Sequence, residues 1–138
     1  MQLPVYFFGD THFKASSSNE ENKKLEKFSK FLDSISKNEK KGSLFIMGDF
    51  FDYYFEYKNQ VTSDYEKIFT RIEEIKNKGF EIYFIAGNHD YWIGKYFKKY
   101  VTKTFLDDTI ITHNNKNIYV THGDGILSWD KSYRLLKK

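Results

Sequence analysis

The chain has 138 residues, with 22 basic and 19 acidic side chains and 40% hydrophobic residues, which predicts one globular domain over residues 1–138 and excludes a disordered chain. The absence of cysteine excludes disulfides and thiolate metal sites and favours a reducing cytoplasm. No apolar run approaches the about 20 residues that span a bilayer, and the mild net charge of +3 gives no reason to expect nucleic-acid binding.

The first part of the chain alternates strand and helix patterns. Residues 1–8 predict a strand, and Ser18 with Glu21 three positions later predicts a capping box at the start of a helix. The buried stripe of that helix is expected to be Leu25, Phe28, Phe31, Leu32 and Ile35. Gly42 ends this segment, and residues 44–47 predict the second strand.

A second helix follows the same pattern. Ser63 and Glu66 predict another capping box, and Gly79 is placed for a left-handed C-terminal cap. The expected buried stripe is Tyr65, Ile68, Phe69, Ile72 and Ile75. Residues 82–86 are apolar throughout, as is typical of a strand covered on both faces.

Residues 96–101 predict a short helix, and residues 109–112 and 117–121 predict two strands joined by a turn at residues 114–116. The alternation as a whole indicates an α/β sandwich with right-handed crossovers.

Four polar motifs each follow directly on an apolar run. They are Gly9–His12, Gly48–Asp52, Gly87–Asp90 and Thr121–Asp124. An open parallel sheet places the carboxyl ends of its strands along one edge, where ligands bind. The motifs therefore predict one site at which several strand ends converge.

The motif residues offer oxygen and imidazole ligands. Asp10 and His12 lie two positions apart, so in an extended segment both would face one ion. Asp49 has two oxygens that could bridge two cations, while Asn88 offers a neutral oxygen and His122 a ring nitrogen. Without sulfur, this donor set suits manganese, iron or zinc.

Two such cations would lower the pKa of a bridging water to about 7 and would clamp phosphoryl oxygens during in-line attack. His89 is then placed to protonate the leaving oxygen or to hold a phosphate oxygen. Asp52 or Asp90 would orient this imidazole, although Asp52 is also compatible with a structural role.

Each motif alone has a plainer interpretation, because a Gly-Asp pair after a strand is usually a turn. The site hypothesis depends on the repeated pairing of histidine with Asp or Asn at the strand ends. His113 lies at the predicted hairpin tip and is interpreted as a solvated residue. Core packing and a substrate-contacting wall both stay open for the aromatic residues Tyr53, Tyr54, Phe55 and Tyr57.

The set of motifs resembles the calcineurin-like metallophosphoesterases, whose ligand blocks are D-x-H, G-D-x-x-D, G-N-H-D/E and H, followed by G-H-x-H. The first four blocks match here as Asp10/His12, Asp49/Asp52, Asn88/His89/Asp90 and His122. The resemblance implies a layered α/β sandwich with mixed β-sheets flanked by helices, and a dinuclear phosphohydrolase that uses a metal-bridged hydroxide. It implies one metal, expected to be manganese, at Asp10, His12 and Asp49, and a second at Asp49, Asn88 and His122.

Within the family, the sequence is most similar to the branch that hydrolyses UDP-2,3-diacylglucosamine, the pyrophosphatase step of lipid A synthesis. Residues 48–58, 87–92 and 122–138 carry this similarity. It implies UMP and lipid X as products and a cytoplasmic protein in peripheral contact with the inner membrane. The substrate-binding residues that it implies are Asn88, His89, Asp130, Tyr133 and Arg134.

The closing G-H-x-H block is absent from residues 1–138, so each metal would lack one histidine. The sequence is therefore expected to be the N-terminal portion of a longer phosphoesterase domain. Two other interpretations stay open: a phosphatase or phosphodiesterase with another substrate, and an inactive truncated module that binds metal.

Overall fold

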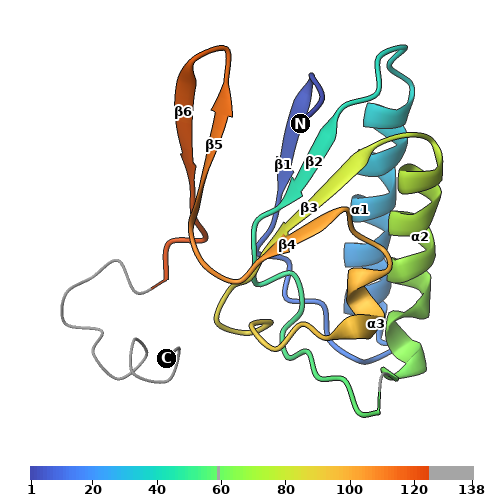
Figure 1. Cartoon of the computed structure of the whole chain (residues 1–138). Coiled ribbons are helices and arrows are strands. Elements are labelled where there is room, and N and C mark those ends of the chain that lie inside the picture. The colour runs from blue at the N-terminus through green and yellow to red at the C-terminus, as the bar shows by residue number, and fades with distance from the viewer. Residues whose placement is uncertain (59, 125–138) are drawn as a thin grey trace.

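The computed structural model describes residues 1–58 and 60–124. A parallel sheet is formed, in this spatial order, by β1 (Val5–Phe8), β2 (Ser43–Ile46), β3 (Glu81–Ile85) and β4 (Lys103–Phe105). The connections carry α1 (Asn19–Ser36), a 3₁₀ turn (Ser63–Tyr65) that leads into α2 (Glu66–Asn77), and the short α3 (Lys95–Lys98). Because each crossover moves the chain one strand further in the same direction, all three helices lie on one face of the sheet (Figure 1).

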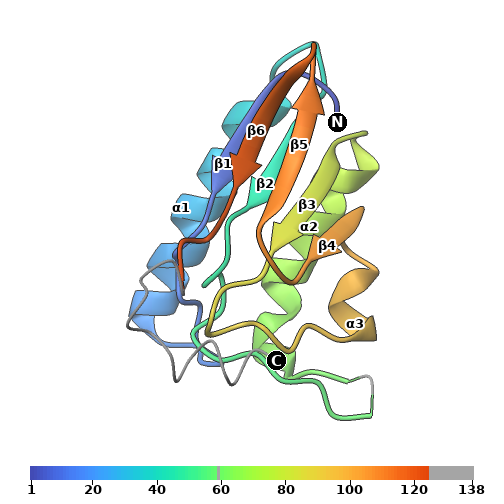
Figure 2. The same cartoon turned by 60° about the vertical axis from the view of Figure 1, so that its left-hand side comes forward.

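The opposite face of the sheet is covered by an antiparallel hairpin of β5 (Thr109–His113) and β6 (Lys116–Val120). Figure 2 shows this hairpin in front of the sheet, with α1 and α2 behind. Phe45, Ile85 and Val120 are buried together between the two layers. Asn114 and Asn115 form the turn with φ values of 49° and 61°, the left-handed pair that a two-residue hairpin turn requires.

The main core lies between the sheet and the helices, and it confirms the predicted α/β sandwich. All five residues of the stripe predicted for α2 are buried: Tyr65, Ile68, Phe69, Ile72 and Ile75. In α1, Phe28, Leu32 and Ile35 are buried, whereas Leu25 and Phe31 pack against the core from its margin.

The predicted helix caps are confirmed only in part. The Ser18 hydroxyl accepts a hydrogen bond from the Glu21 N–H at 3.3 Å, but the Glu21 carboxylate accepts one from the Lys14 N–H at 2.9 Å and does not close the box. The second capping box is wrong, because Thr62 caps the 3₁₀ turn and α2 begins without a side-chain cap. Gly79 has a φ of +94°, which confirms the left-handed end of α2.

Two further features differ from the sequence prediction. β4 was not predicted, and its three residues pair with β3 as the far edge of the parallel sheet. His113 is half-buried rather than solvated, and its Nε2 atom is enclosed without a hydrogen-bond partner in the described part of the chain.

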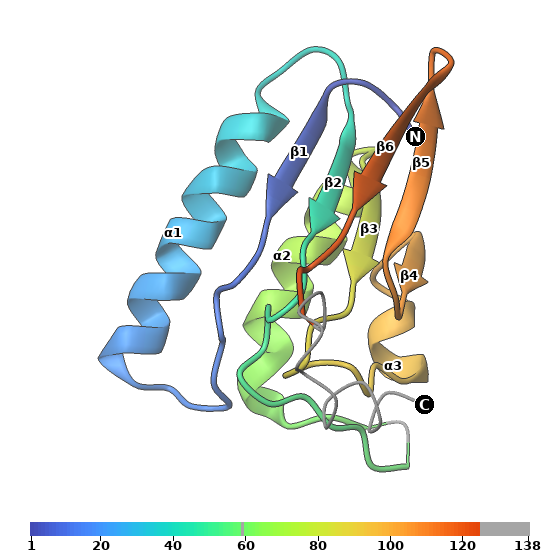
Figure 3. The same cartoon turned by 90° about the vertical axis from the view of Figure 1, so that its left-hand side faces the viewer.

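The four parallel strands point toward one end of the molecule, and the chain leaving β6 arrives at the same end (Figure 3). This arrangement places the four polar motifs at the carboxyl edge of the sheet. Over the described residues, no helix combines the length and apolar character needed to cross a membrane.

Candidate metal centre

The first two motifs lie side by side because backbone pairing continues beyond β1 and β2. The Asp10 N–H donates to the Gly48 carbonyl at 3.0 Å, and the His12 N–H donates to the Asp49 carbonyl at 2.9 Å. The segment is not extended as predicted, since Asp10, His12 and Asp49 have φ values of 56°, 48° and 44°. Left-handed backbone at residues other than glycine costs roughly 1–2 kcal/mol per residue, and such strain clusters at functional sites.

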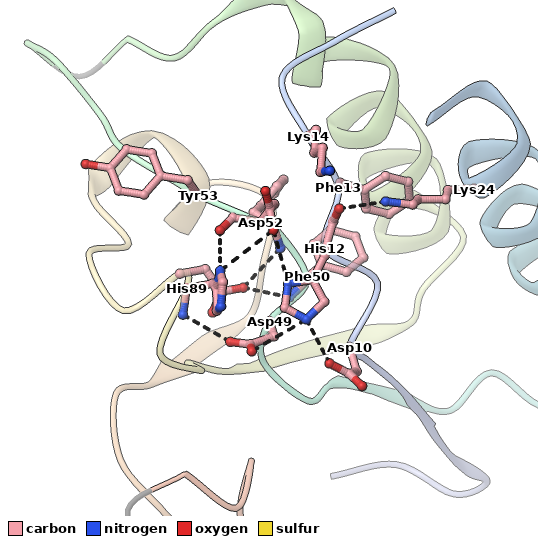
Figure 4. Close-up of polar contacts among 12 residues, drawn as sticks. Asp10, His12, Phe13, Lys14, Lys24, Asp49, Phe50, Asp52, Tyr53 and His89 are labelled. Carbon is pink, nitrogen blue, oxygen red and sulfur yellow. Dashed lines mark hydrogen bonds and ion pairs between the residues drawn. The ribbon is translucent and has the colours of Figure 1, made fainter. Parts of the chain in front are cut away.

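Asp49 is the centre of the site (Figure 4). Its side chain is 8% exposed, and its Oδ2 atom lies 3.7 Å from the His12 Nε2 atom and 3.4 Å from the His122 Nε2 atom. The other carboxylate oxygen accepts a hydrogen bond from the His89 N–H at 3.1 Å. One buried carboxylate therefore faces imidazoles from two different motifs.

Asp10 and His12 meet at the exposed side of this centre. The His12 Nε2 atom lies 3.0 Å from the Asp10 Oδ1 atom, whereas its Nδ1 atom lies 3.5 Å from the Asp52 Oδ1 atom. Ligand atoms of His12, Asp49 and His89 all lie within 4.8 Å of one another, which is close enough for one metal ion.

His122 is held in a single orientation by the backbone. Its Nδ1 atom lies 2.7 Å from the Met47 carbonyl oxygen. Because a carbonyl can only accept, the Nδ1 atom carries a proton, and the Nε2 atom faces Asp49. A Cβ at Gly48 would lie 2.7 Å from the His122 Nδ1 atom and from the Gly87 N atom, so the glycine of the second motif is required for this approach.

His89 is oriented in the same manner. Its Nδ1 atom donates to the backbone carbonyl of Asp52, and the Asp52 carboxylate lies 3.8 Å from the same nitrogen. The rings of His12 and His89 pack edge to face, with centroids 4.7 Å apart. The Nε2 atom of His89 is therefore the ring nitrogen that this hydrogen bond does not use.

Asp90 does not orient His89. Its fully buried carboxylate accepts hydrogen bonds from the N–H groups of Gly87 at 2.8 Å, Phe50 at 2.8 Å and Phe51 at 3.2 Å. Burial raises the pKa of the Asp90 carboxyl, although the three N–H donors act in the opposite direction. Asp90 thus joins the second and third motifs through their backbones.

An open cavity of about 700 Å³ adjoins the centre. Asp10, Asn88 and His122 line it together with apolar residues of β1 and the Met47 side chain. Asn88 is exposed and lines the same cavity as Asp10 and His122. Three predicted substrate-binding residues, Asp130, Tyr133 and Arg134, lie outside the described residues.

Core packing describes only one of the aromatic residues that follow Asp52. Tyr54 is fully buried in the core, while Tyr53, Phe55 and Tyr57 are each more than half exposed. Burial and a hydrogen bond to Glu56 raise the pKa of the Tyr54 phenol. Tyr53 directly follows Asp52 beside the site (Figure 4).

The sequence analysis did not predict the hydrogen bonds that hold the backbone of His12. The Lys24 ammonium donates to the His12 carbonyl oxygen at 2.8 Å and to the Glu21 carboxylate at 2.9 Å. Glu21 is buried and binds the Lys14 N–H as well. The lysine three residues after Glu21 was the available sequence signal, but helical spacing also explains it as a surface ion pair.

The calcineurin-like phosphoesterase family model matches residues 3–137 of the chain. The chain belongs to this family. A UDP-2,3-diacylglucosamine hydrolase of Porphyromonas gingivalis is 28% identical over 143 residues, covering 99% of this chain and 54% of that protein. The hydrolase of the same name from Haemophilus influenzae is 30% identical over 134 residues, covering 96% of this chain and 54% of that protein.

A solved structure of a protein of unknown function from Aquifex aeolicus has the same fold, with a TM-score of 0.55 and 20% identity over 96% of this chain and 69% of that one. The chain spans about half the length of the curated relatives that it matches.

Proposed function

We propose that this chain supplies the metal centre of a metal-dependent phosphohydrolase. Asp10, His12 and Asp49 hold one divalent cation, and Asp49, Asn88 and His122 hold a second. The observation that carries the proposal is the position of Asp49, whose Oδ2 atom lies 3.7 Å from the His12 imidazole and 3.4 Å from the His122 imidazole. A buried carboxylate between two ring nitrogens suits a bridging ligand.

The donor set fits divalent manganese, iron or zinc. The proposed ligands offer carboxylate and amide oxygens with imidazole nitrogens, and the sequence contains no cysteine. His122 also has the hydrogen bond that metal-bound histidines normally make, from its other ring nitrogen to a backbone carbonyl. We propose manganese as the working ion.

When bound, the cations would supply Lewis acidity and a water acidic enough to attack near neutral pH. In the reaction, a water oxygen attacks phosphorus and releases one proton to solvent, the bond from phosphorus to the leaving oxygen breaks, and the leaving oxygen gains a proton. His89 provides that proton or binds a phosphoryl oxygen, because its Nδ1–H is engaged by the Asp52 carbonyl and its Nε2 atom is the one left for substrate. Asn88 contacts a phosphoryl oxygen from the cavity side.

The proposed substrate is UDP-2,3-diacylglucosamine, with hydrolysis of its diphosphate to UMP and lipid X. The support is the similarity to hydrolases of that name over nearly the whole chain. Asp130, Tyr133 and Arg134 are proposed to bind the substrate, and contact with the inner membrane surface would accompany a lipid substrate. Because the relatives are about twice as long, a further segment is proposed to complete the site.

A second candidate follows from that difference in length. A chain spanning about half of its relatives is also compatible with a module that binds metal without turnover. Another phosphate ester as substrate is a third candidate, because the proposed ligands contact only the phosphoryl group.

The experiment uses the purified chain with manganese, and assays release of UMP from UDP-2,3-diacylglucosamine beside hydrolysis of an aryl phosphodiester. Turnover of the lipid nucleotide that disappears in Asp49→Ala and His122→Ala supports the full proposal. Turnover of the aryl ester alone favours another substrate. Binding of about two manganese ions without turnover favours the metal-binding module. Turnover that survives both substitutions would exclude this site.

A further inference from the structure

Glu56 lies in the segment after the second motif, and its half-buried carboxylate is saturated with hydrogen bonds. The Oε1 atom accepts from the Tyr54 hydroxyl at 2.9 Å, the Gly94 N–H at 3.1 Å and the Phe97 N–H at 3.0 Å. The Oε2 atom accepts from the Tyr96 N–H at 2.9 Å. Two of these donors belong to α3 and the third, Gly94, directly precedes it, so Glu56 caps that helix from a distant part of the chain.

Gly94 leaves the space that the Glu56 carboxylate occupies. As the residue before α3 it has no side chain to cap the helix, and a Cβ built there would lie 2.1 Å from the Glu56 Oε2 atom. The φ of Gly94 is −100°, a value that any residue can adopt. The close contact with Glu56, and not the backbone conformation, is therefore what requires a glycine here. A glutamate side chain can normally swing away from a methyl group, but here swinging away would break four hydrogen bonds.

The position of this contact relates it to the metal centre. Glu56 follows Asp52 closely in the chain, and Gly94 similarly follows His89. Between them, the Tyr54 N–H donates to the His89 carbonyl at 3.4 Å, and the His89 Nδ1 atom donates to the Asp52 carbonyl. The two segments that carry these residues are therefore joined at the site itself and again at Glu56.

Two carboxylates connect these two segments. Asp90 makes an inner connection close to the candidate site, and Glu56 makes an outer connection farther along both segments. Asp90 binds the backbones of Phe50 and Phe51, whereas Glu56 binds the start of α3. Loss of the outer connection would free the segment from Asp52 to Glu56 to move relative to His89. A misplacement of about 1 Å at a reacting group can cost about 100-fold in rate.

We infer that Glu56, with Gly94 as its matched partner, is a positioning residue that fixes Asp52 and His89 relative to the phosphoryl group. The inference rests on the proposed function for its consequence in turnover. Its structural content, that this contact determines the orientation of the His89 imidazole, is independent of any activity.

The test uses Glu56→Ala, Glu56→Gln, Gly94→Ala and the double variant Glu56→Ala/Gly94→Ala in the full chain. Glu56→Ala is expected to lower kcat for the aryl phosphodiester about 10-fold or more, while KM and manganese affinity stay within about twofold. Glu56→Gln keeps the oxygen that accepts three bonds and loses only the bond from Tyr96, so it should retain most of the turnover. Gly94→Ala should lower kcat by displacing the carboxylate.

The double variant provides the sharpest comparison. With the carboxylate removed, the alanine methyl group has room, so the double variant should be no worse than Glu56→Ala alone. Multiplicative losses would overturn the inference, as would a fall in kcat that is matched by an equal fall in manganese affinity. If Glu56→Ala does not fold, the Glu56→Gln and Gly94→Ala variants still decide the outcome.

A second measurement separates this inference from the proposed function. In NMR spectra of the side-chain nitrogens, the His89 signals should shift in Glu56→Ala and Gly94→Ala and remain near their original positions in Glu56→Gln. Unmoved His89 signals in all variants would overturn the inference. A wild-type chain without turnover would overturn the proposed function, and the His89 signals would then decide this inference alone.

Discussion

The Nε2 atom of His122 lies 3.4 Å from the Oδ2 atom of Asp49, so the segment that follows β6 meets the segment that follows β2. The hairpin of β5 and β6 makes this possible, because it crosses the sheet face and returns its chain to the carboxyl edge. The contact adds an imidazole from the hairpin layer to candidate ligands that follow neighbouring strands of the parallel sheet.

Replacement of Asp49 by asparagine should abolish the effect of metal on stability. Two cations that bind only the folded chain raise its stability by mass action, by about 2.7 kcal/mol per site at a metal concentration 100 times Kd. Manganese should therefore raise the Tm of the wild-type chain and leave that of Asp49→Asn nearly unchanged in a thermal unfolding experiment.

The matched control for this experiment is Asp33→Asn, because Asp33 is a half-exposed carboxylate of α1 that pairs with Arg71 far from the site. It should keep the full manganese-dependent shift. An equal shift in both variants would show that manganese binds elsewhere.

His122 and His113 provide a second matched pair, since one follows β6 and the other ends β5 of the same hairpin. His122→Ala removes a proposed ligand. Loss of a residue that only hydrogen-bonds to a metal ligand typically weakens metal binding about 10–100-fold, so His122→Ala should weaken manganese binding at least as much. His113→Ala should leave the affinity unchanged within about twofold when both are compared by calorimetric titration with wild type. Equal affinities for the two variants would place the metal away from the hairpin.

The convergence of the first three motifs was predictable, because it does not depend on the order of the parallel strands. Any parallel sheet brings the carboxyl ends of its strands to one edge, so apolar runs followed by Asp10, Asp49 and Asn88 were sufficient. The order of the strands and the placement of the hairpin came only from the structure. β4 could not be predicted since it has three residues and no fully buried side chain.

The local geometry of the ligands was not predictable for a different reason. Asp10 and His12 were expected to face one ion from an extended segment, yet both have left-handed backbone that pairing with the second motif imposes. Glu21 satisfies the spacing of a capping box, but its carboxylate is used by Lys14 and Lys24 instead. In each case the sequence pattern satisfies a local rule, extended spacing in one and the capping box in the other, but a tertiary contact overrides it.

Asp90 gives a prediction on stability that is separate from metal binding. Asp90→Ala would leave three buried N–H groups without their acceptor, and each unsatisfied donor costs about 1–3 kcal/mol. The free energy of unfolding in urea should fall by about 3 kcal/mol or more. Asp64→Ala, which removes an exposed carboxylate, should change it by less than about 0.5 kcal/mol. A loss below about 1 kcal/mol for Asp90→Ala would mean that water replaces the carboxylate readily.

At the end of the sheet opposite the metal centre, Glu81 makes stability depend on pH. Desolvation raises its pKa, but hydrogen bonds from the Ser43 and Tyr83 hydroxyls, the N-terminal ammonium and the Gln2 N–H outweigh this and leave the pKa below 4.5. A carboxyl group with a lowered folded pKa stabilises the protein above its unfolded pKa, and this contribution is lost as pH falls through the folded value.

Glu81→Gln should therefore cost about 1 kcal/mol in the free energy of unfolding at pH 7. The difference from wild type should shrink as pH falls below 4.5, the value from which the pKa of Glu81 is lowered. Chemical denaturation at a series of pH values measures it, with Glu73→Gln, an exposed position of α2, as the control that shows little difference at any pH. A gap between Glu81→Gln and wild type that stays constant down to acid pH would mean that the hydrogen bonds of Glu81 do not depend on its charge.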